Sequence, residues 1–256
     1  VCTRPKFHAP LVIESAKRGV RGILSEKPMA ENLGQAREMV DVSQENNVKL
    51  AIDHQLRFNS PYVVAKELIE NGEIGEIFRV HAVCSGGDLK DNATHTVDLM
   101  RYILGDLPVE WVVGQIDRVG SETQYDLHSE SFGLGYFKFE NNIRGLIESG
   151  NDTAPGYHHI FCYGTDGEIE LAVPGGPAIR MRTKGTSGDW ITPDLPPEIS
   201  PVQDMVAAID EDRQHRSSGY QGLATLELLM AIYQSSRKRR RIHLPLEEPE
   251  SPLTLM

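Results

Sequence analysis

The stretch Gly22-Ile23-Leu24-Ser25-Glu26-Lys27-Pro28-Met29-Ala30 decides the fold. Residues 20–24 form a short, apolar and partly β-branched run, which is typical of a buried strand. Proline fixes its own φ and disfavours helical geometry at Lys27, so the chain turns directly after the strand. Ligands of open α/β sheets bind at the carboxyl ends of the strands, which makes Lys27 a candidate site residue. Taken alone, the pattern also fits a surface lysine in an ordinary strand-to-helix turn.

Helices and strands alternate around this stretch. Residues 1–3 resemble the end of a strand, residues 8–18 a helix, and residues 48–52 a further strand. Asn32 is a predicted N-cap, with Gln35 three residues later and an apolar stripe behind it. Strand, helix, strand, helix, strand is half of a doubly wound parallel sheet with right-handed crossovers.

The other half of such a sheet is not in the sequence. A dinucleotide-binding fold needs a strand that runs into Gly-x-Gly-x-x-Gly at the start of a helix. The glycines at Gly86-Gly87, Gly133/Gly135 and Gly175-Gly176 lack that setting. We therefore expect a fragment that lacks the first three β/α units, where the choice between NAD and NADP would be made.

A second domain follows, so we predict domains 1–56 and 57–256. The helices expected in it cover residues 60–71, 92–104, a segment starting at Ser200-Pro201, and 223–236. The expected strands cover residues 77–84, 109–119, 131–139, 143–149, 160–163, 168–172 and 179–182, with an extended piece at 242–246 and a loose tail at 247–256. Asn141-Asn142 suggests a hairpin turn. The fold class is α/β plus α+β: a partial Rossmann sheet followed by a mostly antiparallel open sheet.

Asp91 and His95 form a second candidate site. A separation of four residues predicts that they share one face at the start of a helix. There a carboxylate could hold one imidazole nitrogen and leave the other free to take a proton, as a general base poised near neutral pH requires. An Asp N-cap beside a solvent-facing His would give the same spacing. Asp98 fits a structural role or an orienting role behind His95.

Composition excludes several classes of function. The net charge of −11 argues against a nucleic-acid partner, and the basic run 237–241 suits the end of a helix. No apolar stretch is long enough to span a bilayer. Three widely spaced cysteines predict reduced thiols in a cytoplasmic protein. No His-Glu-x-x-His, Cys-x-x-Cys or Gly-x-Ser-x-Gly occurs, so we expect no metal and no serine triad.

Several of these patterns together resemble the glucose-fructose oxidoreductase / inositol dehydrogenase / rhizopine catabolism (Gfo/Idh/MocA) family. They are Thr3-Arg4-Pro5 with His8, Glu26-Lys27-Pro28, Arg57-Phe58, Gly86-Gly87 with Asp91 and His95, Gly164-Thr165-x-Gly167, and Leu226-Glu227-Leu228. The resemblance implies hydride transfer between NAD or NADP and a secondary alcohol of a sugar or cyclic polyol. It also implies a Lys27-Pro28 peptide that is usually cis.

The resemblance also implies roles for individual residues. Catalysis falls to Lys27, Asp91 and His95; cofactor binding to Thr3, Arg4, His8, Glu26, Lys27 and Pro28; and substrate binding to Arg57, Tyr157 and His158. His95 would take the hydroxyl proton, Asp91 would orient it, and Lys27 would stabilise the developing alkoxide.

Two other functions stay open. Some members of the family use tightly held NAD in glycoside hydrolysis, and a non-catalytic cofactor sensor could share the fold. We also expect a homo-oligomer joined through the second-domain sheet. Phe132, Leu134 and Tyr136 alternate there with Phe137 and Phe139, so both faces are apolar.

Overall fold

The structure is a computed structural model, and it describes residues 1–118, 123–124, 127–150 and 157–256. Its first unit is a parallel pair of strands, β1 (Gly22–Ser25) and β2 (Lys49–Ile52), with helices α1 (His8–Lys17) and α2 (Leu33–Glu45). Val1 is outside any strand, but it lies beside β1: its carbonyl accepts a hydrogen bond from the Glu26 amide at 3.0 Å. The partial Rossmann unit is therefore confirmed.

The cap of α2 forms as predicted. The Asn32 side chain accepts a hydrogen bond from the Gln35 amide at 2.9 Å, which satisfies one of the free amides at the helix start. The Gln35 side chain accepts in turn from the amide of Glu31, one residue before the expected partner. This cap ends the segment that begins at Lys27.

The second unit is an eight-stranded sheet in the order β11-β10-β9-β3-β8-β7-β4-β12. Its neighbours are antiparallel except β3 and β8, so the sheet is mostly antiparallel, as predicted. Asn141 and Asn142 both have positive φ in the turn between β7 and β8, which is the hairpin expected from their sequence. The strands are β3 (Ile77–Ser85), β4 (Val109–Asp117), β7 (Phe132–Phe139), β8 (Arg144–Gly150), β9 (His159–Gly164), β10 (Gly167–Leu171), β11 (Ile179–Thr183) and β12 (Ile242–His243).

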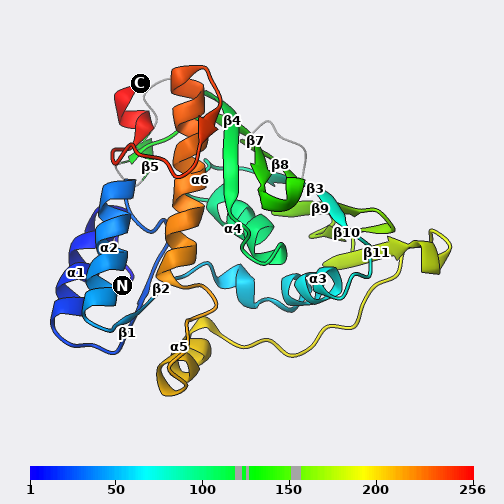
Figure 1. Cartoon of the computed structure of the whole chain (residues 1–256), viewed down its shortest axis with the longest axis horizontal. Helices are drawn as coiled ribbons and strands as arrows, with labels where there is room; N and C mark the ends of the chain where they lie inside the picture. Colours follow the sequence, from blue (N-terminus) through cyan, green and yellow to red (C-terminus); the bar gives the residue numbers. More distant parts are fainter. Residues whose placement is uncertain (119–122, 125–126, 151–156) are drawn as a thin grey trace.

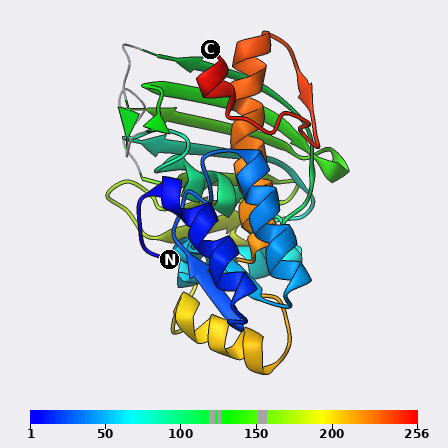
Figure 2. The ribbon, with the colours of Figure 1, turned by 90° about the vertical axis from the view of Figure 1, so that its left-hand side faces the viewer.

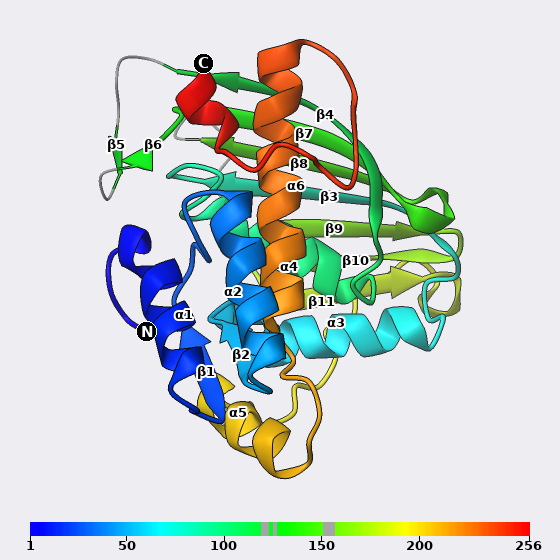
Figure 3. The same cartoon turned by 60° about the vertical axis from the view of Figure 1, so that its left-hand side comes forward.

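Helices α4 (Ala93–Ile103) and α6 (Gly219–Lys238) lie on one face of this sheet (Figure 3). Phe137 and Phe139 are fully buried beneath them. Glycine lets α6 approach closely, because a Cβ on Gly135 would lie only 2.5 Å from Ile232. On the opposite face Tyr136 remains 39% exposed, so the predicted alternation of the two faces is confirmed.

Helix α6 stands between the two units (Figure 1). It begins at Gly219, not at the predicted Leu223, because its first residues pack against β2. A Cβ on Gly222 would lie 2.4 Å from Ile52, so glycine here serves close packing and does not end the helix. Helix α3 (Ser60–Glu70) follows the link between the units, and α5 (Pro201–Asp210) covers β1, where Gly22 faces Met205.

The prediction of a loose tail at 247–256 is wrong. The Pro249 carbonyl accepts a hydrogen bond from the Gly34 amide at 2.9 Å, at the start of α2. Leu253 is 1% exposed within a short 3-10 helix, Pro252–Leu255, that lies beside the upper half of α6 (Figure 2). Three consecutive buried residues, 251–253, and the hydrogen bond from the Gly34 amide anchor the tail, and these contacts produce no periodic pattern in the sequence.

Two short strands were not predicted, β5 (Thr123–Gln124) and β6 (Leu127–His128), which pair with each other. The strand predicted at 109–119 ends at Asp117, and residue 119 lies outside the described residues. No helix in the described part of the chain is long and apolar enough to cross a membrane.

Candidate active site

Lys27 follows β1 and reaches the segment before α4. Its Nζ donates hydrogen bonds to Asp91 Oδ1 at 2.6 Å and to the Asp91 carbonyl at 2.9 Å. The two side chains are only 21% and 12% exposed, so the ion pair is largely shielded from water. The Lys27–Pro28 peptide is cis, as the resemblance implies. Two predicted catalytic residues, 64 positions apart in the sequence, therefore meet.

The structure gives Asp91 a different setting from the predicted one. Helix α4 begins at Ala93, so Asp91 lies in the preceding turn and not on the helix face. Its carboxylate pairs with Lys27, whereas Nδ1 of His95 is buried and has no hydrogen-bond partner among the described residues. The spacing of four residues did bring the two side chains to the same end of α4, although through a turn.

Three imidazole rings meet at this end of α4, and we call His54, His95 and His158 the histidine cluster. The ring of His95 lies 5.6 Å from that of His54 and 5.9 Å from that of His158, nearly perpendicular to both. Burial lowers the pKa of His95 to about 2, and the nearby His54, Lys27 and His158 add to this shift. The expected pKa near neutrality is not found, and the ring is neutral at physiological pH.

The other two rings of the histidine cluster are neutral as well. Burial lowers the pKa of His54 to about 4, against the opposing effect of Asp98. Burial and then Lys27 lower the pKa of His158 to about 4. A neutral imidazole has the lone pair that a base needs, whereas the lowered pKa makes each ring a weaker base than a free imidazole.

His54 is the site residue that the sequence analysis missed. Its Nε2 lies 3.1 Å from Thr94 Oγ1, and its Nδ1 lies 3.4 Å from Asp98 Oδ1 without meeting hydrogen-bond geometry. A signal was present: His54 follows β2 as Lys27 follows β1. The carboxyl ends of two adjacent parallel strands meet at one edge of a sheet.

Arg57 has no exposed surface, which corrects its predicted role in substrate binding. Its guanidinium donates to Asp98 from Nε at 2.6 Å and from Nη2 at 2.8 Å. It also donates to Asp106 at 2.9 and 2.8 Å and to the Arg216 carbonyl at 3.2 Å. All five N–H groups of Arg57 are thus used inside the protein.

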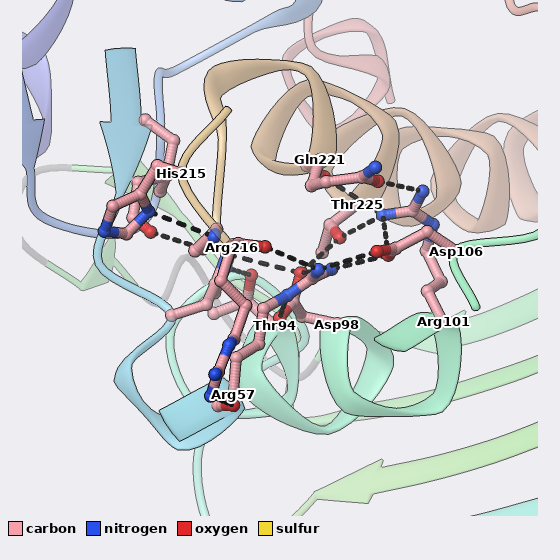
Figure 4. Close-up of polar contacts among 12 residues, drawn as sticks. Arg57, Thr94, Asp98, Arg101, Asp106, His215, Arg216, Gln221 and Thr225 are labelled. Carbon is pink, nitrogen blue, oxygen red and sulfur yellow. Dashed lines mark hydrogen bonds and ion pairs between the residues drawn. The ribbon is translucent and has the colours of Figure 1, made fainter. Parts of the chain in front are cut away.

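We call Arg57, Asp98, Arg101 and Asp106 the arginine network; Figure 4 shows its connection to α6. Arg101 donates to the Gln221 carbonyl and to Thr225 Oγ1, both at 3.0 Å. Thr225 donates to Asp98 at 2.9 Å. Burial alone would raise the pKa of Asp98, but Arg57 and His54 outweigh burial and lower it, so Asp98 stays ionised. Asp98 lies 3.4 Å from Nδ1 of His54, so the residue it adjoins in the histidine cluster is His54.

Among the predicted cofactor-binding residues, His8 is buried, whereas Thr3, Arg4 and Glu26 have side-chain surface that a ligand could reach. His8 is fully buried, with Nδ1 2.8 Å from the Pro28 carbonyl and Nε2 3.1 Å from the Thr3 carbonyl, so it joins these two turns. The side chains of Thr3 and Arg4 are exposed, and Glu26 is half-buried. His8 therefore shapes the segment that holds Lys27 and has no surface left for a ligand.

His158 lies beside the ring of His95, and Tyr157 precedes it in the chain. Nδ1 of His158 is 2.8 Å from Thr96 Oγ1, and its backbone φ is +56°, an unusual value for a non-glycine residue. Tyr157 is 62% exposed, and its hydroxyl lies over Gly86. The structure thus brings His158 to the predicted catalytic residues and leaves Tyr157 at the margin.

Among the described residues no group of three or more His, Cys, Asp or Glu side chains could hold a metal ion. Cys2 is exposed, whereas Cys84 and Cys162 are buried free thiols. Burial raises the pKa of Cys162 to about 12, so this thiol is not a nucleophile.

The fold thus has two units, one with a parallel strand pair and one with a mostly antiparallel sheet, and the Lys27–Asp91 pair joins them. Residues 1–54 match "Oxidoreductase family, NAD-binding Rossmann fold", and residues 66–244 match "Oxidoreductase family, C-terminal alpha/beta domain". The chain belongs to the Gfo/Idh/MocA family of oxidoreductases.

Individual relatives are distant. Inositol 2-dehydrogenase of Rhizobium meliloti is 25% identical in an alignment that covers 95% of this chain and 79% of that protein. D-apiose dehydrogenase of Rhizobium rhizogenes is 24% identical, over 95% of this chain and 78% of that protein. An uncharacterized oxidoreductase of Streptococcus pneumoniae is 27% identical over 67% of this chain, and the chain spans only 51% of its length.

Solved structures show the same fold. Aldose-aldose oxidoreductase from Caulobacter crescentus, complexed with glycerol, has a TM-score of 0.83 at 20% identity, over 95% of this chain and 78% of that chain. The WlbA dehydrogenase from Bordetella pertussis, in complex with NADH and UDP-GlcNAcA, has a TM-score of 0.76 at 26% identity, over 96% of this chain and 79% of that chain.

The residues at the ends of β1 and β2 fit the reactive end of a dinucleotide. Three buried polar atoms there, Oγ of Ser25, Oδ1 of Asp53 and Nδ1 of His54, have no hydrogen-bond partner among the described residues, which marks a place for a ligand. The Lys27–Asp91 pair borders the same edge. No glycine-rich loop for a pyrophosphate occurs in the sequence, so this fit concerns the nicotinamide end alone.

Proposed function

We propose that this protein catalyses the reversible oxidation of a secondary alcohol of a sugar or cyclic polyol with NAD or NADP. The observation that carries the proposal is the 2.6 Å contact between Lys27 and Asp91 beside the neutral ring of His95. An ammonium group and a proton acceptor at one point are what alcohol oxidation requires. The family relation and the named sugar and polyol dehydrogenases among the relatives support the same reaction.

Each residue has a distinct task in this proposal. His95 accepts the hydroxyl proton. Lys27 stabilises negative charge on the substrate oxygen, and Asp91 holds the ammonium group in place for this. The bound nicotinamide would take the hydride. His158 lines the substrate side of His95, and the hydroxyl of Tyr157 extends that side over Gly86.

The two other functions make different demands on the same site. Glycoside hydrolysis through transient oxidation would release product without net reduction of the cofactor. A sensor would need no base, yet a buried ring without a partner for Nδ1 stands beside the Lys27–Asp91 pair. The site therefore favours an enzyme over a sensor.

A substrate screen tests the proposal. The assay uses the chain extended by the glycine-rich unit that the sequence analysis expects, which we call the NADH-binding form. It is incubated with NAD⁺ or NADP⁺ and with myo-inositol, aldoses and aryl glycosides in parallel. We expect net formation of reduced nicotinamide with a free polyol or aldose. Cleavage of an aryl glycoside without net reduction would favour the hydrolase, and cofactor binding without turnover would favour the sensor.

We also propose that copies of the chain associate through the uncovered face of the large sheet. Val113 and Tyr136 are neighbours there, 44% and 39% exposed, and the Trp111 ring lies 5.8 Å from the Tyr136 ring at an interplanar angle of 56°. Contiguous exposed apolar side chains often mark an interface. Light scattering should give a dimer or larger assembly, and Tyr136→Lys should reduce its mass. A monomer at micromolar concentration would contradict this.

A further inference from the structure

The turn that carries Asp91 contains several charged side chains that are buried. Asp88, Lys90 and Asp91 follow one another in the segment between β3 and α4, and all three are buried. Glu130, which comes from the chain just before β7, is only 3% exposed beside them. Acidic and basic side chains are almost never buried unless they are paired, so this group calls for a specific explanation.

Two carboxylates hold the backbone of this turn. Glu130 Oε1 accepts a hydrogen bond from the Leu89 amide at 2.6 Å, and Asp88 Oδ1 accepts one from the Asp91 amide at 2.6 Å. Hydrogen bonds to an ionised carboxylate are roughly twice as strong as neutral ones. The amides on both sides of Lys90 are therefore fixed, one of them by a side chain from another part of the fold.

Tyr233 supports Glu130 from behind. Its hydroxyl donates to the second oxygen of Glu130, Oε2, at 3.0 Å, and Tyr233 is fully buried in the middle of α6. The chain of contacts runs from α6 through Glu130 to Leu89 and, two residues later, to Asp91 and Lys27. These contacts thus connect α6 with the Lys27–Asp91 pair.

The charged groups that face Glu130 come from the turn and from α6. They are Asp88 and Lys90 in the turn and Tyr233 in α6, and Glu31 in turn faces Lys90. Burial, and then Asp88, raise the pKa of Glu130 to about 7. Burial lowers the pKa of Lys90, against the attraction of Asp88 and Glu130. Only the ionised Glu130 offers full negative charge to both the Leu89 amide and the Tyr233 hydroxyl.

We infer that Glu130 and Tyr233 are positioning residues of the reaction, which hold the turn 88–91 so that Asp91 keeps Lys27 at the substrate oxygen. The inference rests on the proposed function for its catalytic part. Its structural part, the anchoring of the turn, is independent of any activity. Small displacements of a catalytic group lower rates strongly, which is why such a support matters.

Tyr233→Phe is the first test, because it removes one hydroxyl and keeps the buried ring. Hydrogen–deuterium exchange on the 256-residue chain should show amides 89–91 exchanging about tenfold faster, as expected for one lost hydrogen bond to a charged group. In the NADH-binding form kcat should fall by about tenfold, with the dissociation constant of NADH unchanged. Tyr62→Phe, a buried tyrosine in α3, is the matched control and should change neither.

Glu130→Gln is the second test, and it separates charge from shape. The amide oxygen of glutamine can still accept from Leu89, so protection of that amide should largely survive. In the wild type, kcat should rise as pH increases through about 7, as Glu130 ionises. In Glu130→Gln this step should be absent, a result that a purely structural role would not give.

The outcomes are distinguishable. Wild-type exchange at 89–91 in Tyr233→Phe, or an unchanged pH profile in Glu130→Gln, would overturn the positioning role. Loss of kcat in His95→Ala and Lys27→Ala without any effect of Tyr233→Phe would overturn it while leaving the proposed function intact. Full activity of His95→Ala would instead refute the proposed function, and the exchange experiment would still decide the anchoring of the turn.

Discussion

The histidine cluster and the arginine network are adjacent buried polar regions, but they differ in how completely their groups are paired. Arg57 uses all five of its N–H groups, on Asp98, Asp106 and the Arg216 carbonyl. In the histidine cluster, Nδ1 of His95 and Nδ1 of His54 lack hydrogen-bond partners within the described chain. A buried group without a partner costs free energy, so it is expected where a ligand completes the contact.

The two regions meet at one point. Asp98 takes two hydrogen bonds from Arg57 and lies 3.4 Å from His54. The satisfied network thus fixes one wall of the histidine cluster. The difference indicates that the arginine network supplies stability and that the histidine cluster supplies function. Four measurements can break or sharpen this contrast.

Removing Arg57 should have the largest effect on stability. Arg57→Met removes the cation that holds the fully buried Asp98 carboxylate and leaves Asp106 only Arg101, at 3.7 Å; breaking such a buried pair typically costs about 3–5 kcal/mol. Urea denaturation should show this loss of unfolding free energy. Arg18→Met is the matched control, because Arg18 forms an exposed helical pair with Glu14 and should change stability by less than about 0.5 kcal/mol. Equal effects of the two variants would contradict the contrast.

The histidine cluster should make stability depend on pH. Burial lowers the pKa of His54 from 6.5 to about 4 in the folded protein. Between these two pH values the unfolded chain therefore binds a proton at His54 that the folded chain does not bind. Stability should therefore be full above pH 6.5 and fall as pH drops toward 4, by about 1.4 kcal/mol per pH unit for this group. His95 and His158 act in the same direction.

His54→Gln tests how much His54 contributes to the pH dependence of stability, because glutamine keeps a polar contact to Thr94 but does not titrate. The slope of unfolding free energy between pH 6.5 and 4 should decrease. His243→Gln, at an exposed position in β12, should leave the slope unchanged. The same slope in both variants would show that His54 is not held neutral.

Cofactor binding should be weak in the 256 residues alone. The histidine cluster offers contacts to the reactive end of a dinucleotide, but the sequence holds no glycine-rich loop whose amides could cradle the pyrophosphate. Isothermal titration with NADH should therefore show no binding at micromolar concentration. Micromolar affinity would mean that the residues present suffice.

The sequence predicted the site better where a local pattern carried it. Lys27 and Asp91 were singled out because a strand end and a spacing mark them, and the structure brings them together, although Asp91 pairs with Lys27 and not with His95 as the spacing suggested. The partnership of Arg57 with Asp98 spans 41 positions, and no pairing rule connects residues so far apart. Arg57 was therefore assigned to the substrate, whereas burial decides its role.

The fold, like the site, was predicted where local sequence patterns mark it. Alternating patterns gave both sheets, and the Asn141-Asn142 turn was placed correctly. The start of α6 was missed, because glycine normally weakens a helix and here it permits contact with β2. The anchored tail was missed as well, since it rests on the buried residues 251–253 and on the Pro249 carbonyl, which accepts a hydrogen bond from the first turn of α2. The domain boundary at 56/57 stays a prediction.

The most direct test of the central claim is kcat for His95→Ala, Lys27→Ala and the double variant, measured with the NADH dissociation constants in the NADH-binding form. His95→Ala should lower kcat by about a hundredfold or more, because proton transfer by a placed base contributes at least that much, and it should leave NADH affinity almost intact. Lys27→Ala should also lower kcat, and the two losses should be less than additive, because both residues serve the same transition state. If His95→Ala keeps more than about half of the wild-type kcat with the true substrate, far above the loss expected for a general base, the catalytic assignment is wrong.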